Sequence, residues 1–289
     1  MIIMALDDGI GGDFPLHSRV IEVIASHVPG FCPNPVGKGE YFDAAGRHVY
    51  FYLQELHDMD VRAAPDPAGL ATAIAELHQK AMSPNGMFGY PIITGRGTQD
   101  RTEHWDKSWA GHFTFLFQDL IKLDNQVNGP WPEYDLACRQ LIEGVIPRLL
   151  GALQSEGRNI TPVLVHGDLW EGNVATDKAT GKVIIFDADE CMYGHNEIEF
   201  GTWRCRWASH FKSPIYIKSY QRRIKPSEPV REWDDRNHQS GHMRLSRPSW
   251  KHVKNHYAPL ENLEKYDPMK DIGVTGILEP YDINAGVVS

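Results

Sequence analysis

Three oxygen-bearing side chains, Asp168, Asn173 and Asp187, have the types and the spacing that phosphoryl transfer requires. Asn173 follows Asp168 by five residues, which is the interval between the catalytic Asp and the metal-binding Asn of kinases. A carboxylate such as Asp168 can orient an acceptor hydroxyl and take its proton, whereas Mg²⁺ prefers hard oxygen ligands. The pattern therefore predicts a phosphotransferase with Asp168 as its catalytic base and with Asn173 and Asp187 as its metal ligands.

Two short apolar runs must position these side chains. Residues 163–165 end directly before His166-Gly167-Asp168, and residues 183–186 end directly before Asp187. Both runs are short and rich in β-branched residues, which is typical of buried strands. We therefore expect two adjacent strands that carry the carboxylates and the amide oxygen at their ends.

Each of these residues also has an ordinary structural use. An Asp after a strand is commonly a turn residue or a helix cap, so only the combination of motifs favours a catalytic site. His166 is interpreted as a structural hydrogen-bonding residue, because Asp168 already fills the role of base. Trp170 either lines the acceptor site or closes the loop, and the sequence favours neither use.

Two other chemistries explain the motifs less well. A hydrolytic metal cluster would leave Asn173 and the strand pairing without a purpose; its members would be Asp187, Asp189, Glu190 and His195. A serine nucleophile is not expected, because the chain contains no Gly-x-Ser-x-Gly sequence. An aromatic stripe at helical spacing is assigned to the core rather than to a cofactor site; it consists of Trp105, Trp109, Phe113 and Phe117.

The composition narrows the class of protein. The chain has 289 residues, of which 42% are apolar, and a formal net charge of −9. This length allows one large or two-lobed domain, and an acidic chain without a long basic run argues against general nucleic-acid binding. Four cysteines without C-x-x-C or zinc spacing favour a reduced intracellular protein. Because neither an 18-residue apolar run nor a signal-peptide core occurs, we expect a soluble cytoplasmic protein with no membrane partner.

The remaining patterns predict a small strand-bearing N-terminal part followed by a mainly helical part. A strand is expected over residues 48–56, and helices over 15–28, 70–82, 105–123, 134–153, 198–211 and 215–224. Gly/Pro-rich residues 29–39 and 83–101 predict connections. No strand is expected before Gly9, Gly11 and Gly12, so these glycines do not predict a phosphate-binding loop.

Longer segments resemble the fructosamine kinase and ketosamine-3-kinase family, whose fold is aminoglycoside-phosphotransferase-like and protein-kinase-like. The resemblance is carried by residues 166–173 (HGDLWEGN), 186–187 (FD) and 193–197 (YGHNE). Further segments look particularly like the fungal branch, namely residues 88–90 (FGY), the helix with Trp105 and Trp109, 145–150 (VIPRLL), 227–229 (SEP) and 233–237 (WDDRN). The likeness extends over about residues 10–237.

The resemblance implies ATP-dependent phosphorylation of the 3-hydroxyl of a sugar ketoamine, with ATP and Mg²⁺ as cofactors. The usual acceptor is a ribulosamine or fructosamine on a protein lysine, or a small ketosamine, and the unstable 3-phosphate then frees the amine. Asp168 would be the catalytic base, and Asn173 and Asp187 the magnesium ligands. The strand end at Glu55 and Leu56 would be the hinge whose backbone meets adenine. A helix carboxylate, Glu199, would steady the catalytic loop.

The ends of the chain depart from the family pattern. The family has a Gly-rich hairpin and a strand Lys before the first helix, and we expect both to be missing here, with Asp13 aligned to the helix Glu that pairs with this Lys. Ala188 stands where the family usually has Pro. The resemblance therefore predicts an α+β, protein-kinase-like two-lobed fold with a truncated N-terminal lobe and hinge (1–56). A helical C-terminal lobe (57–237) and an atypical, weakly ordered tail (238–289) would follow.

Functions from different classes remain open. The first is a ketosamine 3-kinase impaired by the loss of the lysine, since positioning and electrostatics supply most of the catalysis of phosphoryl transfer. The second is a catalytically inactive, pseudokinase-like binding remnant. A kinase of another small alcohol, such as an aminoglycoside or choline, is disfavoured by Trp170 and by the segment 193–197.

Overall fold

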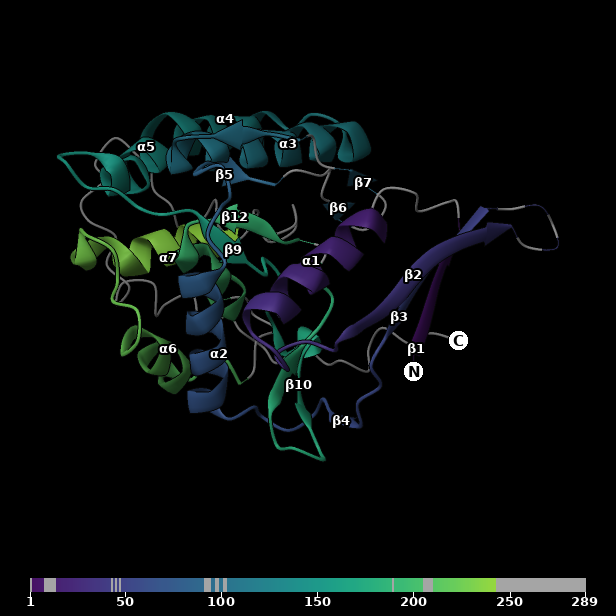
Figure 1. Cartoon of the computed structure of the whole chain (residues 1–289). Coiled ribbons are helices and arrows are strands. Elements are labelled where there is room, and N and C mark those ends of the chain that lie inside the picture. Colours follow the sequence, from purple (N-terminus) through teal and green to yellow (C-terminus); the bar gives the residue numbers. More distant parts are fainter. Residues whose placement is uncertain are drawn as a thin grey trace.

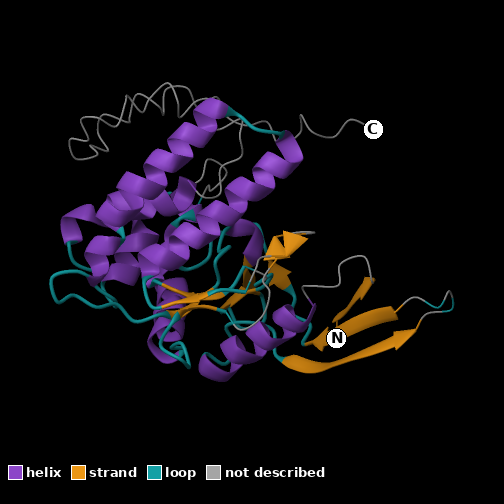
Figure 2. Ribbon diagram, turned by 90° about the horizontal axis from the view of Figure 1, so that it is seen from above, coloured by secondary structure: helices purple, strands orange, loops and turns teal. Residues whose placement is uncertain are grey.

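The described chain consists of a three-stranded sheet with one helix and a larger, mainly helical part (Figure 1). The computed structural model describes residues 2–7, 14–42, 44, 46, 48–90, 95–96, 99–100, 103–188, 190–204 and 210–242. Figure 2 shows the strands of the first part projecting from one side of the molecule, while long helices lie over the other part. This arrangement follows the order of elements expected from the sequence.

The N-terminal sheet has the antiparallel strand order β1-β3-β2. Its strands are β1 Ile2–Asp7, β2 Pro35–Phe42 and β3 His48–Gln54. Helix α1 Phe14–His27 buries one face, including Val20, Ile21 and Ile24, in the main core. The predicted helix over 15–28 and the predicted strand over 48–56 are confirmed.

Strand β2 shows that the predicted connection over 29–39 is wrong in its second half. Pro35 is tolerated because it is the first residue of an edge strand. Gly39 lies under the ring of Phe51, where a Cβ would come within 2.7 Å of the ring. Gly39, which suggests a loop in the sequence, is therefore needed in the strand because the aromatic ring of Phe51 covers it.

Strand β1 contradicts the expectation that no strand precedes Gly9, Gly11 and Gly12. It is paired with β3 over its whole length, from Ile2 opposite Gln54 to Asp7 opposite Val49. A short edge strand such as β1 is hard to predict, because its six residues show too little of the alternating pattern that is typical of strands. The three glycines and Asp13 lie outside the described residues.

The helical part is built from segments that bury their apolar stripes in one core. They are α2 Pro67–Lys80, α3 Trp109–Asn128, α4 Pro132–Gln140, a π-helical turn Leu141–Val145, α5 Ile146–Leu149, α6 Pro214–Gln221 and α7 Trp233–His242. The N-cap Asp66 accepts a hydrogen bond from the Gly69 amide at 2.6 Å, and Pro67 opens the helix at a position where its missing N–H has no cost. Such caps explain why α2 begins a few residues before the apolar periodicity predicts.

Most helix predictions are confirmed in place, with shifted ends. The helix expected over 105–123 begins at Trp109, because Trp105–Asp106 forms strand β8. Trp109, Phe113 and Phe117 are buried in the core, as expected, and Trp105 packs against it. The stretch 134–153 is helical in consecutive pieces, the last being the 3-10 segment Gly151–Gln154.

The helix expected over 198–211 is wrong. Two 3-10 segments, Asn196–Phe200 and Thr202–Arg204, take its place, and residues 205–209 are outside the described chain. Glu197 and Glu199 are both buried in the first segment and bond to other elements. Their tertiary partners explain why this stretch does not behave as an amphipathic surface helix.

Two small sheets carry the motif residues. The first has the order β8-β5-β12-β9, with β5 Phe88–Gly89, β12 Met192–Gly194 and β9 Val163–Val165. The second has the order β11-β10-β4, with β4 Met59–Asp60, β10 Val174–Asp177 and β11 Val183–Ile185. The predicted loop over 83–101 therefore contains β5 and also the short hairpin of β6 Gly95–Arg96 and β7 Gln99–Asp100.

The C-terminal stretch is described only in part. Helix α7 continues to His242, past the boundary expected at residue 237, and the tail from residue 243 lies outside the described chain. No helix within the described ranges is long and apolar enough to cross a membrane.

Candidate active site

The loop that carries Asp168 begins with a turn that only glycine fits. Strand β9 is followed by His166, and Gly167 then takes a left-handed conformation with φ of +79°. A Cβ on Gly167 would lie 2.3 Å from the backbone oxygen of Glu190. The turn therefore passes close to the neighbouring chain and directs Asp168 out of the buried strand, with its side chain partly exposed.

Asn173 holds Asp168 in place. Its Nδ2 donates to the backbone oxygen of Asp168 at 2.8 Å and lies 3.2 Å from the Oδ2 carboxylate oxygen. Because both partners are acceptors, the amide nitrogen must face Asp168, and the amide oxygen must point the other way. Asn173 thus orients the predicted base and leaves a hard oxygen on its opposite side.

Asp187 is brought beside this pair by the β10–β11 hairpin. Val174 pairs with Ile185, and the Phe186 amide donates to the backbone oxygen of Asn173 at 3.1 Å. Asp187 then turns into the left-handed region, with φ of +61°, and its side chain is exposed. A non-glycine residue held in this conformation is under local strain, which is often found where a side chain must be aimed. The backbone of Phe186 thus places Asp187 directly after a contact with Asn173, which in turn contacts Asp168.

His166 connects the two strand ends. Its Nδ1 accepts the Asp168 amide at 3.2 Å, and its Nε2 lies 3.0 Å from the backbone oxygen of Phe186. An acceptor at Nδ1 and a donor at Nε2 define a neutral ring whose nitrogens are both engaged. These contacts agree with the interpretation of His166 as a structural residue.

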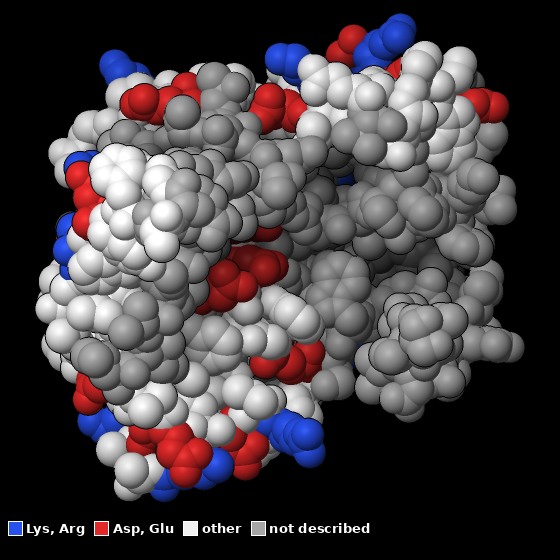
Figure 3. Space-filling view, turned by 90° about the vertical axis from the view of Figure 1, so that its right-hand side faces the viewer, with Lys and Arg blue, Asp and Glu red and all other residues white. Residues whose placement is uncertain are grey.

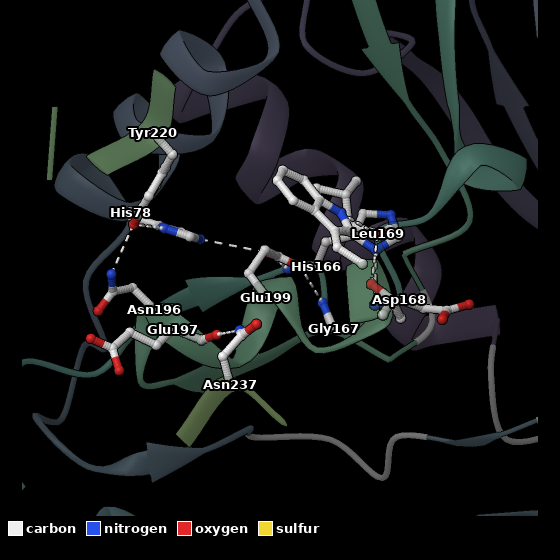
Figure 4. A network of polar contacts seen from close by, with 12 residues as sticks. His78, His166, Gly167, Asp168, Leu169, Asn196, Glu197, Glu199, Tyr220 and Asn237 are labelled. Atoms are coloured by element: carbon white, nitrogen blue, oxygen red, sulfur yellow. Dashed lines mark hydrogen bonds and ion pairs between the residues drawn. The ribbon is translucent and has the colours of Figure 1, made fainter. Parts of the chain in front are cut away.

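The side chain of Glu199, which is 2% exposed, also anchors the loop (Figure 4). Its two carboxylate oxygens accept the amides of His166 at 2.7 Å and Gly167 at 3.1 Å. Burial by itself raises the pKa of Glu199, but the hydrogen bonds from His78 and from the His166 amide outweigh burial and lower the pKa. Glu199 is therefore an anion in the folded protein, as its expected role of steadying the loop requires.

Leu169, the residue after Asp168, is held through its backbone oxygen. The Leu169 oxygen accepts hydrogen bonds from Thr202 Oγ1 at 2.7 Å and from Trp203 Nε1 at 2.9 Å. The ring of Trp170 lies against Gly172, where a Cβ would be 2.3 Å from the ring. This contact supports a loop-closing role for Trp170.

A second buried ion pair lies behind the loop, and sequence reasoning missed it. Arg236 Nε donates to Glu197 Oε2 at 2.8 Å, and Arg236 Nη2 donates to Oε1 at 3.1 Å. The Ser227 amide adds a third bond to Glu197 at 2.8 Å. Burial raises the pKa of Glu197, but His195 and Arg236 outweigh it and hold the pKa at about 2. Local spacing in the sequence could not reveal this pair, because its members are 39 residues apart.

The predicted hinge residues, Glu55 and Leu56, directly follow β3 and have exposed side chains. The Glu55 amide donates to the Asn34 oxygen at 2.9 Å, and Asn34 Nδ2 donates to Glu55 Oε2 at 2.7 Å. The adjacent His57 lies 2.7 Å from Asp177 at the end of β10. Residues 55–57 therefore join the N-terminal sheet to the hairpin that precedes Asp187.

The hydrolytic metal cluster receives no support. Within the described residues, no group of three His, Cys, Asp or Glu side chains could hold a metal ion. Asp189, one of its expected members, lies outside the described chain, and His195 faces Glu197 at 3.4 Å. Figure 3 shows acidic side chains in the hollow at the centre of the face that carries the N-terminal sheet, with Lys and Arg mostly near its margins.

The fold belongs to a known class of phosphotransferase-like structures. A Haemophilus somnus protein assigned as a fructosamine-3-kinase matches with a TM-score of 0.60 and 18% identity, over 96% of this chain and 83% of that chain. Aminoglycoside phosphotransferase APH(4)-Ia, in a ternary complex with AMP-PNP and hygromycin B, matches with a TM-score of 0.52 and 16% identity, over 82% of this chain and 75% of that chain. The mixed helix and sheet architecture is thus kinase-like.

The chain belongs to the fructosamine kinase family, whose sequence model matches residues 14–239. A rice protein named protein-ribulosamine 3-kinase, chloroplastic, is 32% identical over 167 residues, which are 57% of this chain and 44% of the rice protein. The corresponding Arabidopsis thaliana protein is 30% identical over 187 residues, which are 64% of this chain and 51% of the Arabidopsis protein. The chain therefore spans about half the length of these curated relatives.

Proposed function

We propose that the protein is an ATP-dependent kinase that phosphorylates the 3-hydroxyl of sugar ketoamines. The observation that carries this proposal is the pair of contacts made by Asn173, whose side chain holds Asp168 and whose backbone holds the residue before Asp187. The names of relatives support the acceptor class, since rice has a protein-ribulosamine 3-kinase and mouse a ketosamine-3-kinase. The acceptors would be ribulosamines or fructosamines on protein lysines, or small ketosamines.

Asp168 would act as the catalytic base. Its carboxylate is partly exposed at the end of a buried strand, and Asn173 fixes its orientation. A carboxylate in this position accepts a hydrogen bond from the acceptor hydroxyl and takes the proton as the oxygen bonds to phosphorus. Because His166 uses both ring nitrogens for the backbone, Asp168 is the group left to perform this task.

Asn173 and Asp187 would hold Mg²⁺. An amide oxygen and a carboxylate are hard donors that suit this ion, and kinases use the same pair of residue types. When bound, the ion neutralises negative charge on the phosphate oxygens of ATP. The backbone hydrogen bond between Phe186 and Asn173 would hold these two metal ligands near each other even without the ion.

The nucleotide would bind between an N-terminal lobe of residues 1–56 and a C-terminal lobe of residues 57–237. Leu56 is 59% exposed at the end of β3, where an apolar side chain can cover adenine while the backbone of Glu55 and Leu56 bonds to it. The AMP-PNP complex of APH(4)-Ia supports a nucleotide site in this fold.

The test is ADP release from ATP and Mg²⁺ in the presence of ribulose-lysine or fructose-lysine. Asp168→Asn should lower kcat by about 10²- to 10⁴-fold, since an amide cannot take the proton. Glu156→Gln is the matched control, because it removes an exposed carboxylate from the loop before β9. Absence of turnover with both ketoamines would contradict the proposed function, and wild-type turnover by Asp168→Asn would contradict the role of Asp168.

One observation favours a second function, that of a non-catalytic binding module. Strand β1 precedes the first helix, where kinases of this class place the lysine that binds phosphates, and it contains no basic residue. Isothermal calorimetry with ATP and Mg²⁺ distinguishes the two functions. Measurable binding supports the kinase, whereas no heat and no shift of the melting temperature support the binding module.

A further inference from the structure

A chain of polar side chains, most of them fully buried, links two helices that are far apart in sequence to the catalytic loop (Figure 4). His78 on α2 lies with its Nε2 3.4 Å from Glu199, the residue that accepts the amides of His166 and Gly167. The other ring nitrogen of His78 lies 2.8 Å from the hydroxyl of Tyr220 on α6. Asn196 completes the chain, with its Nδ2 2.8 Å from the same hydroxyl.

The direction of these hydrogen bonds follows from the chemistry of the groups. The Asn196 amide can only donate through Nδ2, so the Tyr220 oxygen is an acceptor in that bond. The Tyr220 hydrogen is then available for Nδ1 of His78, and the ring proton must lie on Nε2, facing Glu199. The opposite tautomer would set a lone pair of the ring against a carboxylate oxygen.

We propose that Asn196, Tyr220 and His78 form a positioning relay that keeps a hydrogen-bond donor aimed at Glu199 and so fixes the turn before Asp168. His78, Tyr220 and Glu199 are each 3% exposed or less, so they act through the loop rather than on the substrate. The effect on turnover rests on the proposed kinase function, whereas the effect on the loop does not.

The chain offers a matched control on the same helix. Tyr216 is also buried on α6, but its hydroxyl donates to the backbone oxygen of Pro65 at 2.8 Å. Tyr216→Phe and Tyr220→Phe each remove one buried hydrogen-bonded hydroxyl without changing the ring. Only Tyr220→Phe breaks the connection to Glu199.

The first test compares these two variants with the wild type. In Tyr220→Phe we expect kcat to fall by about tenfold with both KM values unchanged, because the acceptor and ATP contacts remain in place. Hydrogen exchange at the amides of His166 and Gly167 should accelerate, and ¹⁵N NMR should show His78 protonated at Nε2 in the wild type and redistributed in the variant. Tyr216→Phe should keep the wild-type kcat and the wild-type exchange at these amides.

The second test uses two amides that mimic opposite nitrogens of His78. The NH₂ group of His78→Gln reaches the position of Nε2 and can still donate to Glu199, whereas that of His78→Asn reaches only the position of Nδ1. We expect His78→Asn to lose up to about 10² in kcat, as a displaced catalytic group does, and His78→Gln to recover a clear part of it.

Three outcomes would overturn the relay. The first is unchanged exchange at the loop amides in both Tyr220→Phe and His78→Asn. The second is equal kcat for the Gln and Asn variants. The third is a wild-type spectrum with both nitrogens of His78 protonated, since the Tyr220 hydrogen would then have no place on the ring. If the wild type does not phosphorylate ketoamines, the proposed function fails, and the exchange and NMR results still decide the relay.

Discussion

The N-terminal sheet and the surroundings of the catalytic loop use their charged groups in opposite ways. In the sheet region, Lys38 on β2 and Glu22 on α1 lie 2.9 Å apart, with side chains that are 45% and 46% exposed. Behind the loop, the side chains of Arg236 and Glu197 are 1% and 4% exposed. The Lys38–Glu22 pair is solvated, whereas the Arg236–Glu197 pair is buried and hydrogen-bonded to protein groups instead of water.

This difference indicates which part of the molecule must keep one geometry. A buried ion pair adds little net stability, but removal of one partner leaves an uncompensated charge and is strongly unfavourable. Glu199 therefore restricts the turn before Asp168, and Glu197 restricts the segments that carry Ser227 and Arg236, to the arrangement that satisfies each carboxylate. The sheet depends instead on backbone pairing and an apolar face, so its surface charges can change at low cost.

The largest expected effect is that of Arg236→Ala. This change leaves the buried Glu197 carboxylate without its bidentate partner and frees the backbone oxygens of Ser227 and Pro229. The free energy of unfolding should fall by about 3–5 kcal/mol. Urea unfolding followed by circular dichroism measures the loss. A decrease below about 1 kcal/mol would show that this buried pair contributes no more than an exposed surface pair, which would contradict the proposed difference.

Gly167→Ala should come next, because it combines left-handed strain with a collision against the Glu190 oxygen. We expect a loss of more than about 2 kcal/mol and a fall in kcat of about 10²-fold, since the turn before Asp168 must move. The control is Gly181→Ala in the β10–β11 turn. Gly181 has φ of +70°, but no described atom lies within 4 Å of its added Cβ.

Gly181→Ala should therefore cost only the strain, about 1–2 kcal/mol, and leave kcat unchanged. Equal effects of the two variants on kcat would contradict the role given to the close contact at Gly167. Thermal unfolding and ADP release measure both quantities on the same preparations.

Lowering the pH should reduce the stability that comes from the buried carboxylates Glu197 and Glu199 more than the stability that comes from the exposed pair of Lys38 and Glu22. The pKa of Glu197 is about 2 in the folded protein against an ordinary value of 4.5, and that of Glu199 is also lowered. A lowered folded-state pKa contributes stability that is complete above the unfolded value and is lost as the pH falls from about 4.5 towards 2. Urea unfolding between about pH 6 and pH 3 should show this loss, and Glu197→Gln should flatten the profile.

The smallest effect is expected for Lys38→Ala. Its partner Glu22 remains hydrated, so the free energy of unfolding should change by less than about 1 kcal/mol and less still at high salt. The acid profile of this variant should match that of the wild type. A loss of about 2 kcal/mol or more would mean that the two regions do not differ as proposed.

Much of the candidate site could be predicted because its signals are local. The apolar runs before Asp168 and Asp187 became β9 and β11, and the five-residue interval to Asn173 corresponds to a side-chain contact. Predictions failed where local composition misleads. β2 contains the proline and glycines that suggested a connection. The segment Asn196–Phe200 is a 3-10 helix because the side chains of Glu197 and Glu199 bond to Arg236 and Gly167.

The sequence by itself determined the chemistry: which residues could act as base and metal ligands, and in which order along the chain they occur. The tertiary structure alone decided what holds them, because buried hydrogen bonds join groups that lie far apart in sequence. Tyr220 reaches His78 across 142 residues, and Arg236 reaches Glu197 across 39. Burial removes the water that would otherwise serve these groups, so only the packed fold can specify their partners.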